Sequence, residues 1–174
     1  MNNQICVILD DERWNDYLKE CKVWANEVFA LTLLYLKNEN LGFEGWENKK
    51  IIINLSLSND ECVQALNLQF RGKNKPTNVL SFANIDDECF ADMLAENSEI
   101  ELGDIIVALD TLQREAKEKN ILLENHFAHL LVHGILHLFG YDHQVDEEAD
   151  EMEGIEVEIL KKLNIENPYN EVDA

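Results

Sequence analysis

The sequence predicts a single α+β domain in which a small mixed sheet of about four strands, partly antiparallel, is covered by helices. Short β-branched apolar runs occur among longer stretches whose apolar residues recur every three or four positions. The 174 residues suit one domain with a substantial core, whereas two independent domains would be cramped. No internal repeat or interdomain linker divides residues 1–174.

The elements follow from these patterns in chain order. Residues 5–9 form a short apolar run and predict a first strand, and residues 14–37 carry a helical stripe. Residues 41–46 hold two glycines and predict a turn, and residues 50–58 alternate as a strand does. Ser58 and Glu61 then have the spacing of a capping box, which predicts a helix to about Phe70.

The second half of the chain begins with a loop that glycine and proline predict, followed by an acidic stretch. Gly72 and Pro76 predict a loop, so the strand expected over 78–83 lies at a sheet edge or beside a cleft. An acidic connection over 84–101, which we expect to be mobile and partly helical, leads to a core strand over 102–109. The helices expected after it cover residues 110–120, capped by Asp110 and Thr111, then 122–138 and 146–163. Residues 165–174 are expected to fray.

The net charge of −21 argues against loose nucleic-acid binding, because phosphate contacts come from Lys and Arg. The acids are concentrated, however: residues 84–110 and 142–158 hold nine each and no Lys or Arg, so the remainder is nearly neutral. Arg71, Lys73 and Lys75 also cluster, as do the basic residues within 114–119. A local cationic strip and ordinary solvated charges are both compatible with this composition.

The compartment follows from what the sequence lacks. No stretch approaches the roughly 20 apolar residues that a membrane helix needs, so no membrane partner is expected. The first residues lack the basic and apolar regions of a secretory signal, and the four cysteines are scattered without a CxxC pair. We therefore expect a cytoplasmic protein with reduced thiols.

The strongest functional signal is a histidine motif with the spacing HxxxHxxGxxH. His133 and His137 lie four residues apart, so a helix places both imidazoles on one face. Gly140 can end that helix in the left-handed conformation and turn the chain back, so that His143 supplies a third imidazole. Three protein ligands leave one coordination position open, as in catalytic zinc sites. Zinc is favoured, although nickel, copper or iron also accept imidazole.

Three nearby polar residues are expected to assist rather than to bind the metal. His126 and His129 share the same helical face but lie too far along it, so we expect core or supporting roles. Asp142 has two equal interpretations: it orients a ligating imidazole, or it caps the turn.

The residue after the first histidine bears on the chemistry. The spacing resembles that of metzincin proteases, in which a glutamate follows the first histidine and acts as general base. Gly134 occupies that position here, so a peptidase built on this site lacks its base. A metal site can still act on a phosphodiester, and Arg71 is the best candidate to stabilise the developing charge, because its planar fork matches phosphate oxygens. An ordinary surface arginine at a helix end is the alternative.

Four blocks of sequence carry a resemblance to a known family. They are residues 126–143 (HFAHLLVHGILHLFGYDH), residues 66–82 from Leu-Asn through Leu-Ser-Phe, residues 102–105, and Met152, Glu156, Ile159 and Leu160 in the last helix. In this order they resemble the YbeY endoribonucleases, bacterial metal-dependent proteins of ribosomal RNA maturation. The resemblance covers about residues 60–162. Two positions depart from it: Asn78 stands where the family usually has aspartate, and Ala83 where it usually has proline.

The resemblance implies a function and a site. His133, His137 and His143 would be the ligands of one Zn²⁺ per chain, and Arg71 would line the catalytic cleft. The activity would be single-strand-specific RNA cleavage in maturation of the 16S rRNA 3′ end and in ribosome quality control. The partners would be single-stranded or ribosomal RNA and the small ribosomal subunit, and not DNA.

Two other functions stay open at this point. The metal site could hydrolyse another substrate, such as a peptide or a small amide, with a different acid as base. Alternatively, the chain could be a ribosome assembly factor whose metal is mainly structural. Chelation would unfold such a protein.

Overall fold

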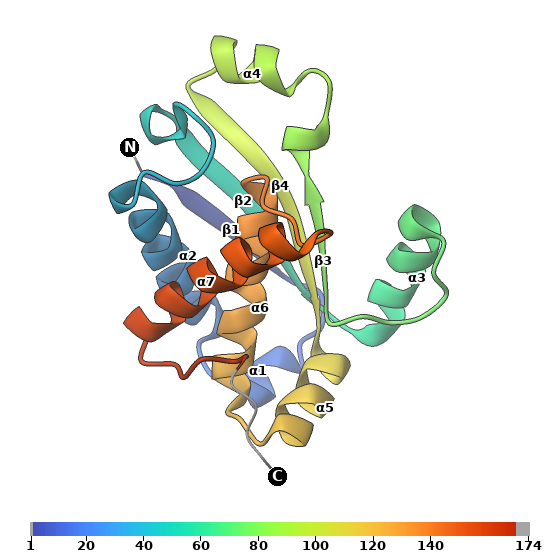
Figure 1. The fold of residues 1–174 in the computed structure, drawn as a ribbon. Coiled ribbons are helices and arrows are strands. Elements are labelled where there is room, and N and C mark those ends of the chain that lie inside the picture. Colours follow the sequence, from blue (N-terminus) through green and yellow to red (C-terminus); the bar gives the residue numbers. More distant parts are fainter. Residues whose placement is uncertain (1, 170–174) are drawn as a thin grey trace.

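The computed structural model describes residues 2–169 and shows, within that range, a four-stranded sheet and seven α-helices (Figure 1). The strands are β1 Gln4–Leu9, β2 Lys50–Ser58, β3 Val79–Ala83 and β4 Glu99–Ala108. The helices are α1 Trp14–Tyr17, α2 Cys21–Asn38, α3 Asp60–Arg71, α4 Phe90–Glu96, α5 Leu109–Lys119, α6 Leu123–Leu138 and α7 Asp146–Lys162, with 3₁₀ turns η1 Trp46–Asn48 and η2 Asn84–Asp86. The predicted α+β class with a small mixed sheet is confirmed.

The strand order is β1-β2-β4-β3, in which the first three strands are parallel neighbours and β3 pairs with β4 in antiparallel fashion. β3 therefore lies at an edge, as expected from its position after Pro76. The register of β2 and β4 shifts between Ile52 and Ile53, opposite Gly103, whose φ is +141°. A Cβ added to Gly103 would lie 2.0 Å from the carbonyl oxygen of Phe82. Only glycine therefore lets β3 approach β4 this closely.

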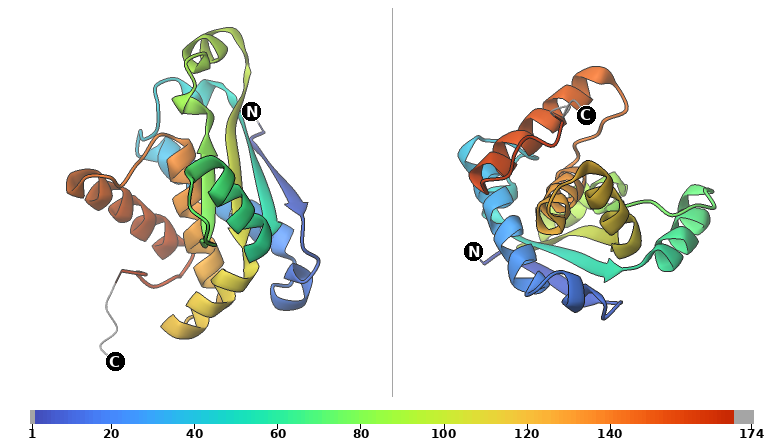
Figure 2. Two further views of the ribbon diagram at one scale, coloured as in Figure 1. Left: turned by 90° about the vertical axis from the view of Figure 1, so that its right-hand side faces the viewer. Right: turned by 90° about the horizontal axis from the view of Figure 1, so that it is seen from below.

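Helices cover the two faces of the sheet unequally. The large core lies on one face, where α2, α6 and α7 pack together over the strands (Figures 1 and 2). On the other face α3 packs on β3 and β4 through a separate small cluster of Val63, Leu80, Ile106 and Ala108. In Figure 1 and in the right-hand view of Figure 2, α3 and the loop after it stand apart from the other helices, beside the β3 edge.

The single helix expected over residues 14–37 is wrong, because the chain breaks between α1 and α2. Leu18 is extended at φ −133° and Glu20 is left-handed at φ +52°. Trp14 is fully buried and its Nε1–H donates to the carbonyl oxygen of Ser58 at 2.8 Å, while its ring packs edge-on against Phe127. α1 is thus held at the end of β2, and α2 starts in a new direction.

The helix starts also differ from the capping expectations. Asn59, not Ser58, caps α3: its Oδ1 accepts from the Cys62 N–H at 2.9 Å. Asp110 does not cap α5, which begins at Leu109 without a side-chain cap. Ser58 is drawn into the sheet end and fully buried. The sequence pattern placed both helices correctly to within two residues, and only the cap assignments change.

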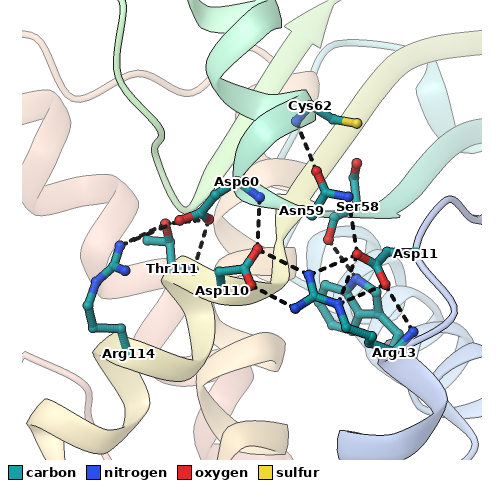
Figure 3. A network of polar contacts seen from close by, with 10 residues as sticks. Asp11, Arg13, Ser58, Asn59, Asp60, Cys62, Asp110, Thr111 and Arg114 are labelled. Atoms are coloured by element: carbon teal, nitrogen blue, oxygen red, sulfur yellow. Dashed lines mark hydrogen bonds and ion pairs between the residues drawn. The ribbon is translucent and has the colours of Figure 1, made fainter.

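A network of carboxylates and arginines joins these helix starts at the carboxyl ends of β1, β2 and β4 (Figure 3). The guanidinium of Arg13 contacts Asp11 at 2.9 Å and Asp110 at 2.9 Å. The backbone N–H of Asp60 donates to Asp110 at 3.1 Å, and the Asp60 carboxylate accepts from the N–H of Thr111 at 2.9 Å. The start of α3 is thereby fixed to α5 and to the β1–α1 turn, so the far end of α3 has a defined position.

This network predicts how stability depends on pH. Hydrogen bonds from Arg13 lower the pKa values of both Asp11 and Asp110 below their ordinary range. A carboxyl with a lowered folded pKa stabilises the fold above its unfolded pKa, about 3.9, and loses that contribution as pH falls through the folded value. In Arg13→Gln we therefore expect a lower Tm at pH 7 and a shallower loss of Tm below about pH 4. Thermal unfolding followed by circular dichroism over this range measures both.

Arg114→Gln is the matched control, because Arg114 belongs to the same network but lies 3.7 Å from Asp60 and contacts neither Asp11 nor Asp110. This substitution removes the same charge. We expect its Tm to fall below about pH 4 as steeply as that of the wild type. If Tm fell equally steeply below pH 4 in the wild type and in Arg13→Gln, the role assigned to the contacts of Arg13 with Asp11 and Asp110 would be wrong.

Two further expectations concern the acidic connection and the tail. The connection over 84–101 contains η2 and α4, and Phe90 of α4 is buried. Fraying was expected from residue 165, yet Ile165 is buried and the phenol of Tyr169 contacts Glu156. Residues 170–174 of that tail lie outside the described residues. Among residues 2–169, no helix combines the length and apolarity that crossing a membrane requires.

Candidate metal centre

The histidine motif lies at the end of α6, where the predicted geometry is present. His133 and His137 occupy successive turns, and their ring centroids are 4.5 Å apart. Gly140 is left-handed at φ +99° and follows Phe139, the residue that caps the end of the helix. The N–H of Tyr141 donates to the carbonyl oxygen of Leu136, and that of Gly140 to His137. These are the two bonds of a Schellman motif, which reverses the chain as the glycine predicts.

The reversal brings His143 back to the other two imidazoles. Its ring centroid lies 5.4 Å from that of His133 and 5.0 Å from that of His137. One ring nitrogen from each of the three residues lies within 4.8 Å of the others, so the cluster could hold a metal ion. The Nε2 atoms of His133 and His137 are 3.0 Å apart, near the roughly 3.3 Å that two nitrogens at zinc–nitrogen distance have in a tetrahedral site.

The other ring nitrogens determine which tautomers are present. Nδ1 of His137 donates to the Tyr141 carbonyl oxygen at 2.9 Å, and Nδ1 of His133 donates to the Glu156 carboxylate at 3.2 Å. With both protons on Nδ1, the two Nε2 lone pairs face each other. Two facing lone pairs of this kind can bind one cation placed between them. Burial, with the neighbouring imidazoles of His133 and His143, lowers the pKa of His137 to about 4, so His137 is neutral at pH 7 and suits metal ligation.

Glu156 of α7 holds this side of the site, and sequence reasoning assigned it no role. It is fully buried, and it accepts hydrogen bonds from His129 at 3.0 Å, from His133 and from the Tyr169 hydroxyl at 2.9 Å. Burial alone would raise the pKa of Glu156, but the hydrogen bonds from the two histidines outweigh it and lower the pKa to about 2. The available signal was a glutamate on the apolar face that contains Met152 and Ile159.

Replacing Glu156 by glutamine is expected to weaken divalent-metal binding by about 10- to 100-fold. Glutamine keeps the size of the side chain but places an amide N–H₂ among three donors, so the His133 ring loses its fixed orientation. Competition with a chromogenic chelator measures the change in affinity.

Glu115→Gln supplies a matched control, because Glu115 also accepts from a buried histidine of α6, His126, at 2.9 Å. That pair does not touch the three-histidine cluster. Glu115→Gln is expected to lower Tm and to leave metal affinity unchanged. If Glu156→Gln bound the metal as tightly as the wild type, the role assigned to Glu156 would be wrong.

His126 and His129 have the core and supporting roles expected for them. Both are buried, and neither belongs to the three-histidine cluster. Glu115 accepts from His126 and also from the Nδ2 of Asn78 at 3.0 Å. The hydrogen bond from His126, with that from Asn78, lowers the pKa of Glu115. Asn78, the departure from the family pattern, thus donates to a carboxylate where aspartate would repel it.

Asp142 caps the turn, which was one of its two interpretations. Its Oδ1 accepts from the backbone N–H of His143 at 2.7 Å, while the Nδ1 of His143 lies 3.9 Å away. Imidazole orientation is instead supplied by the Tyr141 carbonyl and by Glu156, neither of which the motif spacing revealed. A backbone carbonyl carries no residue-type signal, and Glu156 lies on another helix.

Arg71 and the three histidines line one cleft of about 720 Å³, which the loop after α3 and the β3 strand enclose on the other side. Lys73 and Lys75 also line it. Arg71 ends α3, and its Nη2 donates to the Ser81 carbonyl oxygen on the free edge of β3 at 3.0 Å. Residues distant in sequence thus place cationic side chains and imidazoles around one space.

Gly134 faces the sheet on the side where β3 and β4 pack against α6. A Cβ there would lie 3.1 Å from the Ile105 side chain and 3.2 Å from the Ser81 hydroxyl oxygen. The position therefore offers little room for any side chain. Close packing of α6 on the sheet therefore leaves little space for a glutamate at this position.

Comparison with known proteins places the chain in a family. The model of the family described as Endoribonuclease YbeY matches residues 11–164. Endoribonuclease YbeY of Paramagnetospirillum magneticum is 48% identical over 97% of this chain and 96% of its own length. The protein of that name from Acinetobacter baumannii is 55% identical over 61% of this chain and 66% of its own.

A solution structure of a Thermotoga maritima protein supports the fold. It has a TM-score of 0.55 and 22% sequence identity, and the match covers 97% of this chain and all of that one. At this identity the likeness concerns the fold alone. The family model and the match to the Paramagnetospirillum protein extend across the cleft, including Arg71 and the histidine motif. The chain belongs to the Endoribonuclease YbeY family.

Proposed function

We propose that this chain is a zinc-dependent, single-strand-specific endoribonuclease that acts in ribosomal RNA maturation, at the 3′ end of 16S rRNA, and in ribosome quality control. The observation that carries the proposal is the shared cleft, in which His133, His137 and His143 face Arg71 and two lysines. The family name, Endoribonuclease YbeY, supports RNA as the substrate. The cytoplasm is the compartment where such a protein meets ribosomal RNA.

The donor set fits one zinc ion per chain. Three imidazoles with converging nitrogens suit zinc, and three protein ligands leave a coordination position open. When bound, zinc would polarise a phosphate oxygen or lower the pKa of a water molecule. The protein's own contribution is to hold the imidazoles: Glu156 and the Tyr141 carbonyl fix two rings, and the Gly140 turn delivers the third.

Arg71 supplies the charge that a phosphodiester needs. One of its terminal nitrogens is held by the Ser81 carbonyl, which leaves the remaining N–H groups of the guanidinium fork for phosphate oxygens. Preorganised donors of this kind act where negative charge develops in the transition state. Lys73 and Lys75 lie along the same wall and attract the RNA backbone toward it.

To test the proposal, the purified protein is incubated with single-stranded RNA or with a generic peptide pool, with and without chelator, and cleavage of each substrate is measured. We expect metal-dependent cleavage of RNA and none of peptide, because Gly134 provides no general base. Peptide cleavage without RNA cleavage would overturn the proposal in favour of another hydrolase. Unfolding on chelation, with RNA cleavage absent, would favour an assembly factor with a structural metal.

The ribosomal part of the proposal has its own test. A chain with net charge −21 gains little from loose RNA binding, so we propose that the small ribosomal subunit supplies docking contacts. In cells depleted of the protein, 16S rRNA with an extended 3′ end is expected to accumulate. The wild type should restore processing and Arg71→Ala should not. Normal 3′ ends in depleted cells would contradict this part alone.

A further inference from the structure

The polypeptide on one side of the cleft differs in charge from the rest of the chain. Between Cys62 and Ile85 the sequence contains no Asp or Glu but contains Arg71, Lys73 and Lys75, although the whole chain carries −21. This segment forms most of α3, the loop after it and β3. In Figure 1 and in the right-hand view of Figure 2, α3 and its loop project beside the β3 edge, apart from the other helices. A polyanion is therefore attracted to this part of the surface.

An exposed aromatic ring lies within this cationic segment. Phe70 occupies the last turn of α3 and is 60% exposed, the most exposed aromatic residue among residues 2–169. Its ring contacts the ring of Phe82 edge-on, with centroids 5.4 Å apart. The guanidinium of Arg71 lies 5.7 Å from the centroid of the same Phe82 ring. Phe82 thus contacts both the exposed aromatic ring and the cleft arginine.

The loop that carries the lysines is held in place relative to Phe70. The side chain of the buried Asn67 donates to the Lys75 carbonyl oxygen at 2.9 Å, and the Lys73 N–H donates to the Asn67 carbonyl oxygen at 3.2 Å. Gly72 is left-handed at φ +68° and ends α3. The backbone of the loop at Lys73 and Lys75 is therefore fixed relative to α3 before any ligand arrives, which lowers the entropic cost of binding.

We propose that Phe70 is a stacking platform for an unpaired nucleobase of the RNA strand whose phosphates pass Arg71 and the two lysines. The inference rests on the proposed function and extends it to a base-binding position outside the metal site. A cationic track beside exposed aromatic rings is how proteins bind single strands, because every base has a π-face. A paired base has both faces covered by its neighbours, so this contact favours single-stranded over double-stranded RNA.

The test separates stacking from packing by the choice of substitution. Phe70→Leu keeps an apolar side chain against Phe82 but removes the π-face, and Phe70→Trp keeps it. Loss of one stacked base lowers affinity by about 5- to 100-fold, so Phe70→Leu is expected to bind single-stranded RNA weaker by that factor and Phe70→Trp to bind it as the wild type does. Leu68→Ala, on the same helix and 49% exposed, is the control and should leave affinity unchanged.

Fluorescence gives a direct readout. The added indole in Phe70→Trp is expected to be quenched by oligoadenylate and not by a strand whose sugars lack bases, after subtraction of the wild-type titration. Equal RNA affinity of wild type and Phe70→Leu, or equal quenching by the baseless strand, would overturn the stacking proposal. If the wild type cut RNA in that case, the proposed function would stand. If the wild type neither bound nor cut RNA, the proposed function itself would fail.

Discussion

Replacing His143 by alanine is expected to release the metal and to lower the rate of RNA cleavage by about a thousandfold or more. Two imidazoles remain in that variant, and they do not complete the three-ligand set that holds a catalytic metal. The polarising charge that a bound metal would supply at the reacting phosphate would be lost with it. Metal content after dialysis and the cleavage rate of a labelled single-stranded RNA measure the two effects.

The fold of the His143→Ala variant is expected to survive. The His143 side chain is 56% exposed and lies outside the hydrophobic core, so its removal leaves packing intact. Tm should stay close to that of the wild type. Val145→Ala, an equally exposed position two residues further on, is the control and should retain both metal and activity. Full cleavage by His143→Ala would contradict the assignment of the site.

Replacing Arg71 by alanine is expected to slow RNA cleavage by about 10²- to 10³-fold without changing metal content. The guanidinium lies in the cleft but does not contact the histidine cluster, so the two properties separate. Arg71→Lys keeps the charge but loses the planar fork and the fixed contact to Ser81, so it should recover only part of the rate.

Single-turnover cleavage at saturating RNA distinguishes this role from simple attraction. Lys73→Ala and Lys75→Ala remove a cation from the same wall. Each is expected to weaken binding and to reduce the salt dependence by about 0.7 per lost phosphate contact, with little change in the saturated rate. If Arg71→Ala behaved as the lysine variants do, Arg71 would only attract RNA.

Local spacing made much of the site predictable. The spacing of His133 and His137 predicts that both lie on one face of a helix, and Gly140 predicts that the chain reverses after that helix. The structure has both features. The sheet edge followed from Pro76, which interrupts the chain before β3. The break between α1 and α2 was not predictable from periodicity, because Trp14 and Leu18 fit the helical stripe while Trp14 is held by the Ser58 carbonyl of β2.

Contacts between distant segments account for what the sequence did not show. Glu156 reaches His133 from another helix, and the orienting partner of His137 is a backbone carbonyl. The guanidinium chemistry of Arg71 made it a candidate for phosphate binding, but its position in the cleft depends on where α3 starts. That start is fixed by the network of Asp60 and Asp110, which joins three strand ends. Such pairings follow from topology rather than from sequence pattern.

The most direct test of the central claim is a zinc titration of the chelator-treated protein, with the rate of single-stranded RNA cleavage measured at each occupancy. The predicted result is a rate that rises in proportion to bound zinc and reaches a plateau at one zinc per chain, while circular dichroism shows a folded protein throughout. Metal-free protein that is folded and cleaves RNA at the full rate would contradict the claim that the three histidines hold the metal on which cleavage depends.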